Sequence, residues 1–192
     1  MNKSISTFDK ICQTATSIFA THGYDAASLN MIAESVGIRK ASLYSHFQSK
    51  NELFIKAFFD AYKIESSFME SCYKGQINQD NIGGGYLKLL PVRFKESAYL
   101  QLFLRVSFIA PDFIRHEVQE TYRNYLKMIG EYFIHDLQKK NRFLKNKDLS
   151  LFCEAYLGIV DSLHIELIYS NMESYEKKRI AMLEVLSKAM NQ

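Results

Sequence analysis

The chain has 192 residues, of which 47% are hydrophobic and 23% charged, so its composition is globular and excludes wholesale disorder. Two prolines and eight glycines are too few for the many tight turns of a β-sandwich or barrel, which favours long helices. The net charge of +3 is weak evidence, but residues 37–50 carry three cations and no acid, and residues 139–147 carry five. Either run could meet a polyanion or simply be a solvated helix end.

Sequence features also indicate the compartment. No apolar run reaches the roughly 18 residues that a membrane-spanning helix needs, and residues 1–9 lack the apolar core of a signal peptide. Three widely spaced cysteines cannot form a disulfide framework and are typical of a reducing cytosol. We therefore expect a cytoplasmic protein that does not bind a membrane.

The first elements are short helices. Apolar residues at three- and four-residue steps predict a helix over residues 8–22, which ends because Gly23 can adopt the left-handed cap conformation. Ser28 is expected to cap a short second helix that ends at Gly37. A third short helix should follow at about residues 39–47.

Longer helices should fill the rest of the chain. Ser49 and Glu52 have the spacing of a capping box and start a fourth helix. The glycine-rich stretch 74–85 is expected to be a mobile loop. No alternating strand pattern is found, so the sequence predicts an all-α fold. Further helices are predicted over residues 86–96 (with a potential break at Pro91), 98–110, 112–138, 148–171 and 173–190.

Three helices of about 15, 8 and 8 residues, the last two joined by a tight glycine turn, are typical of a helix-turn-helix. The third helix must fit a major groove roughly 12 Å wide. Leu43 and Phe47 would anchor its inner face to the first two helices. The spacing alone does not separate this interpretation from an ordinary small bundle. The outer face offers hydrogen-bond donors from Arg39, Lys40, Ser42, Tyr44, Ser45 and His46.

The residues themselves are more specific than their spacing. Residues 19–24 (FATHGY), 28–38 (SLNMIAESVGI) and 43–54 (LYSHFQSKNELF) resemble the DNA-binding domain of TetR-family transcriptional regulators, and the resemblance covers roughly residues 8–54. The remainder resembles the family only in length and helical character. Within this family, the first half of the chain and residues 98–108 (AYLQLFLRVSF) are similar to the repressors of staphylococcal intercellular-adhesion loci.

The resemblance implies two domains. A helix-turn-helix DNA-binding domain would span residues 5–50, with its recognition helix at about 39–47. A C-terminal helical domain for ligand binding and dimerisation would span residues 51–192. The DNA-binding residues implied by position are Ser28, Arg39, Lys40, Ala41, Ser42, Tyr44, Ser45, His46 and Lys50.

Four of these positions match phosphate contacts in the family. Tyr44 and Lys50 usually hold the DNA backbone, and Ser28 and His46 lie where further phosphate contacts are common. Three of these four residues could instead have a purely structural role. Ser28 and His46 could be helix caps, and Tyr44 could pack at the helix rim. Asn51 replaces an acid that often follows the lysine, which leaves this end slightly more positive.

Four positions lie on the face that usually meets base edges: Arg39, Lys40, Ala41 and Ser45. Arginine can make a bidentate contact to guanine, and Ala41 could touch a thymine methyl group. Ser45 is smaller than the usual residue, so one contact is expected to be missing or to pass through water.

One recognition helix reads only a few base pairs, so specific recognition of a longer operator needs two copies of the protein. We therefore expect a homodimer on a near-palindromic double-stranded DNA operator. The two C-terminal helices resemble the family's dimer-forming helices, although their apolar stripes could also close the core of one chain. The stripe residues are Leu151, Ala155, Ile159, Leu163, Leu167, Ile180, Leu183, Leu186 and Ala189.

Aromatic residues in the middle of the chain could line a cavity for a small apolar or amphipathic inducer, or could simply be core. If Arg105 is buried, it needs an acidic neighbour or an acidic ligand; alternatively it faces solvent. An inducer would act by binding one arrangement of the helices better than the other. The candidate ligand residues are Phe58, Tyr62, Phe103, Arg105, Phe108, Tyr122 and Tyr125.

Other functions find less support. The sequence has no Gly-rich phosphate loop, HExxH, GxSxG or paired metal-ligand spacing, so we expect no enzyme, catalytic residue, metal or cofactor. An adaptor without DNA binding is disfavoured by the acid-free stretch 37–50. The expected function is a dimeric repressor that a small molecule releases from its operator. The alternative is a ligand-independent or thiol-responsive repressor of the same fold.

Overall fold

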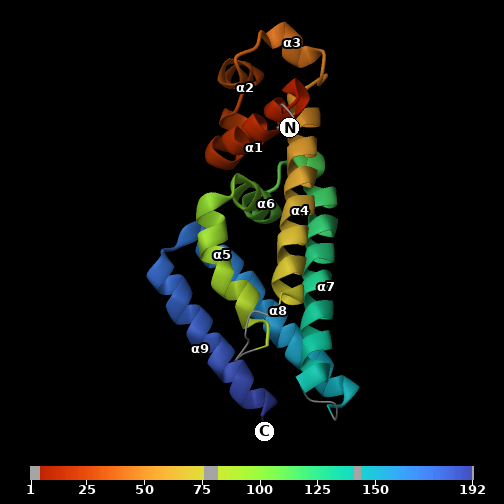
Figure 1. Ribbon diagram of the computed structural model, residues 1–192, viewed down its shortest axis with the longest axis vertical. Helices are drawn as coiled ribbons and strands as arrows, with labels where there is room; N and C mark the ends of the chain where they lie inside the picture. Colours follow the sequence, from red (N-terminus) through yellow and green to blue (C-terminus); the bar gives the residue numbers. More distant parts are fainter. Residues whose placement is uncertain (1–4, 76–81, 141–143, 192) are drawn as a thin grey trace. The chain divides into compact units, whose positions relative to one another are not determined.

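The computed structural model describes residues 5–75, 82–140 and 144–191, and within these ranges it contains helices and no strand, which confirms the all-α fold. None of the described helices is long and apolar enough to cross a membrane. The predicted loop 74–85 and the basic run 139–147 fall partly outside the described residues. The helices are α1 Thr7–Ala26, α2 Leu29–Val36, α3 Lys40–Tyr44, α4 Lys50–Lys74, α5 Gly84–Glu96, α6 Ala98–Phe108, η1 Asp112–Ile114, α7 Arg115–Lys140, α8 Asn146–Tyr169 and α9 Met172–Met190 (Figure 1).

The helices group into two compact units. Unit 1 comprises Met1–Glu65 and Ser97–Val118, and unit 2 comprises Ser66–Glu96 and Gln119–Gln192. Helices α4 and α7 each contribute to both. Compactness does not by itself define a functional domain, so the predicted division after residue 50 stays a prediction.

Helix α1 has a kink near its end. Gly23 has φ 76° and ψ 175°, so the helical path is interrupted where the sequence predicted the helix to end, but the helix resumes and ends at Ala26. The predicted left-handed helical conformation is wrong for this glycine because its ψ is extended. Gly37, with φ 79° and ψ 31°, does adopt that conformation and ends α2. The Ser28 hydroxyl caps the start of α2 by accepting from the Met31 amide at 3.2 Å, which confirms the predicted cap.

The third helix is shorter than the predicted span of 39–47. Helix α3 ends at Tyr44, and the amides of His46 and Phe47 both donate to the Leu43 carbonyl at 3.0 Å, so the chain continues as a turn. The capping box before α4 is also modified. The Ser49 hydroxyl accepts from the Glu52 amide at 3.1 Å as predicted, but the Glu52 carboxylate accepts from the amide of Gln48.

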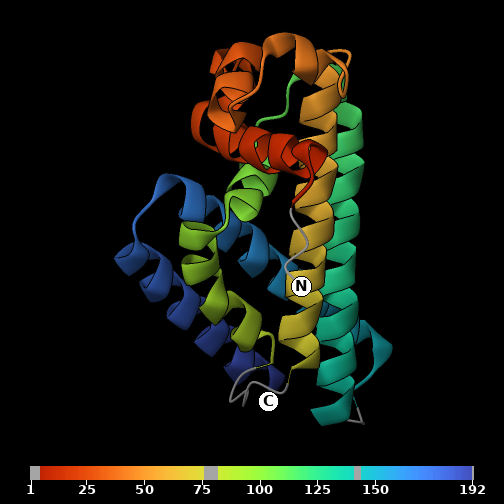
Figure 2. The same cartoon turned by 45° about the horizontal axis from the view of Figure 1, so that its top comes forward.

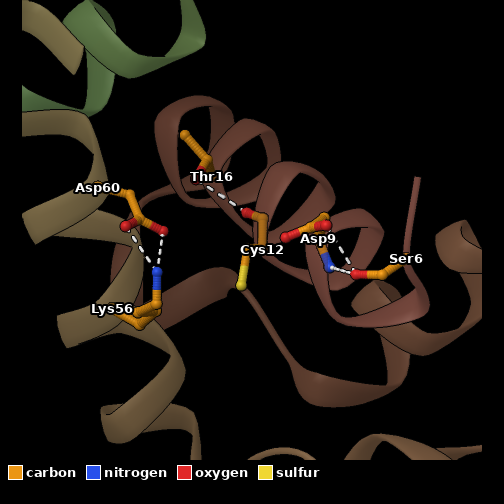
Figure 3. A network of polar contacts seen from close by, with 6 residues as sticks. All are labelled: Ser6, Asp9, Cys12, Thr16, Lys56 and Asp60. Atoms are coloured by element: carbon orange, nitrogen blue, oxygen red, sulfur yellow. Dashed lines mark hydrogen bonds and ion pairs between the residues drawn. The ribbon is translucent and has the colours of Figure 1, made fainter. Parts of the chain in front are cut away.

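In unit 1, α1, α2 and α3 gather beside the N-terminal part of α4 (Figure 2). Helix α1 packs against α2 and α6. Figure 3 shows polar contacts on α1 and α4, which face each other there. On α4 an ion pair of 2.5 Å joins Lys56 to Asp60, and on α1 the Thr16 hydroxyl donates to the Cys12 carbonyl at 2.9 Å. We call α1, α2, α3 and the N-terminal part of α4 the DNA-binding head. Its fully or nearly fully buried apolar core includes Ile11, Ala15, Phe19, Ile32, Leu43, Phe47 and Leu53.

In unit 2, α8 and α9 lie side by side, and α5 packs against both. Helix α5 runs through Pro91 without ending there, so the potential break does not occur. Helix α6 ends two residues earlier than predicted. The turn that starts at Pro111 is a 3-10 helix, which delays the start of α7 to Arg115.

Candidate nucleic-acid interface

The segment from Arg39 to Phe47 has one buried and one exposed side. Leu43 is 0% exposed and Phe47 3%, whereas Tyr44 is 48% exposed. The two buried side chains fix α3 to the head, and Phe47 also stacks on Phe8 of α1 with 5.3 Å between ring centroids. The residues that remain exposed are Arg39, Lys40, Ala41, Ser42, Tyr44, Ser45 and His46.

Local contacts orient several of these exposed side chains. The Lys40 ammonium lies 5.9 Å from the centroid of the Tyr44 ring. The His46 ring meets the edge of Phe8 at 6.1 Å, and the Ser45 hydroxyl donates to the Ser42 carbonyl at 2.7 Å. The structure therefore brings together on one surface the predicted residues of α3 and the turn that follows it.

Ser28 lies at the start of α2 and is half-buried. Its hydroxyl oxygen accepts from the Met31 amide, which leaves the hydroxyl proton for another acceptor. Helix N-termini favour anions because their backbone amides point outward. The position is thus compatible with both the capping and the phosphate role that the sequence allowed.

Lys50, the first residue of α4, has a different environment from the α3 residues. Its half-buried ammonium donates to the carbonyls of Tyr24 at 2.7 Å and Ala27 at 2.9 Å, with the Asp25 carbonyl at 3.4 Å. It also lies 4.1 Å from the centroid of the Tyr24 ring. Sequence reasoning missed these contacts. One available signal was that the last turn of α1 contains no basic residue to meet its terminal carbonyls.

The structure does not bring the seven predicted ligand residues into one unit. Phe58, Tyr62, Phe103, Arg105 and Phe108 belong to unit 1, and Tyr122 and Tyr125 belong to unit 2. Phe58 and Phe103 are fully buried, with ring centroids 5.9 Å apart, and Tyr62 lies at the same distance from Phe103.

Arg105 is exposed rather than buried, and its guanidinium donates to the carbonyl of Ala20 in α1. The acidic neighbour expected for a buried arginine is therefore not required. A cavity of about 210 Å³ lies elsewhere in unit 1, between α1 and α4, and none of the seven residues lines it.

Unit 2 contains a buried polar network centred on His164. The imidazole Nε2 lies 3.1 Å from the Tyr86 hydroxyl, and Nδ1 lies 3.0 Å from the Tyr122 hydroxyl. Tyr122 donates to Asp161 at 2.6 Å, so its oxygen accepts from Nδ1–H, and Nε2 accepts from Tyr86. The hydroxyl of Tyr125 lies 2.9 Å from that of Tyr86, where it can donate.

Burial controls the protonation of this network. His164 is fully buried, and loss of hydration lowers the pKa of its imidazole to about 3, so the ring is neutral at physiological pH. Burial likewise raises the pKa of Tyr122. Sequence reasoning found Tyr122 and Tyr125 but missed the histidine, whose partners come from distant parts of the chain.

Both C-terminal helices leave large apolar side chains exposed. On α8, Leu151 is 63% exposed, Ile165 42% and Tyr169 64%, and helical geometry places these three along one stripe. Gly158 lies in the same stripe and is also exposed. The predicted stripe residues Ile159 and Leu163 are buried and close the core of the chain, as are Leu183 and Leu186 on α9, whereas Ile180 is 55% exposed. The predicted stripes therefore mix two faces.

A short third helix that is anchored by buried residues and exposes cationic and polar ones is typical of a helix-turn-helix DNA-binding domain. Comparison with known proteins agrees. The sequence model of the family described as "Bacterial regulatory proteins, tetR family" matches residues 11–57.

Full-length relatives extend this match. The chain is 26% identical over 168 residues to the biofilm operon icaADBC HTH-type negative transcriptional regulator IcaR of Staphylococcus epidermidis, covering 87% of this chain and 80% of that protein. It is 26% identical over 188 residues to IcaR of Staphylococcus aureus strain Newman, covering 94% and 98%.

Solved structures share the fold. A TetR-family regulator from Mesorhizobium loti has a TM-score of 0.71 at 22% identity, covering 95% of this chain and 96% of that one. A regulator from Aquifex aeolicus has a TM-score of 0.68 at 19% identity, covering 96% and 99%. Residues 11–57 thus match the DNA-binding domain of TetR-family regulators, and the chain as a whole resembles full-length transcriptional regulators of this family.

Proposed function

We propose that this regulator is a homodimeric repressor that binds a near-palindromic double-stranded DNA operator through α3 and is released by a small-molecule inducer. The observation that carries the DNA-binding part is the separation of faces along α3 and the turn that follows it. Leu43 and Phe47 are buried, and the remaining side chains between Arg39 and His46 are exposed. The relatives named as negative regulators support repression.

The proposed DNA contacts divide by chemistry. Arg39 and Lys40 supply cations to base edges, with Arg39 able to hold a guanine by two hydrogen bonds. Ala41 and Ser45 lie beside them and suit a thymine methyl group and a water-bridged contact. The proposed phosphate contacts are Ser28, Ser42, Tyr44 and His46, because each offers a hydrogen-bond donor near the start of α2, on the exposed side of α3 or in the turn after it.

Dimerisation is supported by the exposed stripe on α8. Large apolar side chains at both ends of the stripe flank small residues in its middle, so a second helix can approach closely. At Gly158, an added Cβ would meet nothing within 4 Å in the single chain. A twofold pair of α8 helices along this stripe would bury the exposed apolar surface.

Inducer binding is proposed at Tyr122 and Tyr125. They belong to a buried network of hydroxyl and imidazole groups. A ligand could form hydrogen bonds with these groups that replace the bonds they now form with each other. The thiol-responsive alternative is less favoured, because burial raises the pKa of the Cys12 and Cys153 thiols and so suppresses the reactive thiolate.

The test is selection of genomic DNA fragments with the purified protein, followed by binding measurements on the recovered site. The proposal expects a near-palindrome whose binding is weakened by Arg39→Ala, with Lys177→Ala as a control that removes one exposed charge from α9. A thermal-shift screen against apolar and amphipathic compounds then tests for an inducer. Recovery of fragments without a shared sequence would contradict operator recognition, and no stabilisation by any compound would support the ligand-independent alternative.

A further inference from the structure

The connection between α1 and α2 depends on groups outside it. Residues 24–27 form the last turn of α1 and its C-cap, where backbone carbonyls have no intrahelical donor. Three of these carbonyls converge on one atom, the Lys50 Nζ, at distances of 2.7, 2.9 and 3.4 Å. An ammonium has three protons, so this cluster accounts for all of its donors.

The Tyr24 side chain forms the second half of the same cluster. Its ring lies under the Lys50 ammonium at 4.1 Å, and its hydroxyl donates to the Asn51 side-chain oxygen. The ring also packs against Phe54 at 5.1 Å and Phe113 at 4.9 Å between centroids. Lys50, Asn51 and Phe54 all belong to the first turns of α4, so the residue after Gly23 is attached to α4 by an ammonium, an amide and an aromatic ring.

Asn51 is informative because the family often has an acid there. A carboxylate at this position could pair with the neighbouring lysine, whereas the amide oxygen accepts from the tyrosine without drawing the ammonium away from the carbonyls. The cluster thus uses a residue in which this chain departs from the family pattern.

We propose that Lys50 is a positioning residue rather than a phosphate contact: it fixes the α1–α2 connection to the start of α4 and thereby sets the orientation in which α3 meets DNA. The proposal rests on the proposed DNA-binding function. A phosphate-binding lysine needs an ammonium whose protons are turned toward the DNA, whereas the half-buried Lys50 ammonium donates to the protein's own carbonyls and lies over the Tyr24 ring.

Salt dependence separates the two roles. Each protein cation that neutralises a phosphate contributes about 0.9 to the slope of log affinity against log salt, so a lost phosphate contact at both Lys50 residues of a dimer lowers that slope by about 1.8. Loss of a positioning residue weakens binding while the remaining ionic contacts, and so the slope, stay as they were.

The experiment compares wild type with Lys50→Met in the full-length protein on the selected operator, over a series of salt concentrations. Methionine retains the apolar stem without the charge. We expect operator affinity to fall by about tenfold or more, as for loss of charge-assisted hydrogen bonds, with the slope unchanged. A slope lowered by about 1.8, with wild-type thermal stability, would overturn the proposal.

A milder variant keeps the test decisive if Lys50→Met does not fold. Tyr24→Phe removes only the hydroxyl that donates to Asn51 and leaves the ring in place. We expect weaker operator binding at an unchanged slope, and wild-type affinity for Tyr24→Phe would count against the cluster. Lys40→Met serves as the matched charge control on exposed α3, and its loss of operator affinity checks the proposed function independently of Lys50.

Discussion

Acidification should destabilise the protein through His164. In the unfolded chain its imidazole titrates near pH 6.5, whereas burial holds the pKa in the folded state at about 3. Between these two values the unfolded chain binds a proton that the folded chain does not bind. Stability is therefore lost as pH falls below 6.5, and the loss accumulates until pH reaches the folded pKa.

The magnitude follows from proton linkage. At pH 5.0 protonation of the unfolded imidazole favours unfolding by about 2 kcal/mol relative to pH 7.5. This value is insensitive to the folded pKa, because pH 5.0 lies well above it. Asp161 acts in the opposite direction, since burial raises its carboxyl pKa and stabilises the folded state at low pH. A comparison of variants that differ at the histidine separates the two groups.

The assay is urea unfolding followed by circular dichroism at several pH values from 7.5 to 5.0. We expect His164→Gln to be less stable than wild type at pH 7.5, because it disrupts the buried network, but to lose about 2 kcal/mol less on acidification. His22→Gln, at an exposed position outside the network, controls for the removal of one histidine. Identical pH dependence in wild type and His164→Gln would mean that burial of His164 does not cause the acid sensitivity.

Three further substitutions test other parts of the structure. Leu43→Ala should cost about 2–5 kcal/mol in thermal or urea unfolding, since it empties a fully buried site under α3. Arg39→Ala should weaken operator binding by about 1–3 kcal/mol and relax sequence choice, with little effect on folding. Gly158→Glu should give a folded monomer by sedimentation, while Val92→Glu on α5 stays dimeric; dimeric Gly158→Glu would rule out the α8 stripe.

Much of the DNA-binding head could be predicted because its signals are local. Ser28 caps α2 through the amide three residues later, and Gly37 ends the same helix. The burial of Leu43 and Phe47 follows from helical periodicity. The end of α3 was predicted less well than its start. The helix is shorter than predicted, because two consecutive amides donate to the Leu43 carbonyl and turn the chain.

Long-range polar contacts could not be predicted. The carbonyls held by Lys50 lie 23 to 26 residues earlier, and no spacing rule connects them. The hydrogen-bond partners of His164, Tyr122 and Tyr86, lie 42 and 78 residues earlier in the sequence on two different helices. Arg105 likewise donates to a backbone carbonyl. Every residue has such a carbonyl, so the sequence does not indicate which one an arginine will contact.

Titration of the protein onto the selected operator at fixed moderate salt shows whether the exposed face of α3 reads duplex DNA in a symmetric pair. We expect saturation at an even number of chains for each near-palindromic site and an affinity at least about 10³-fold above that for a scrambled duplex. Equal affinity for the two duplexes, or saturation by one chain, would contradict this expectation.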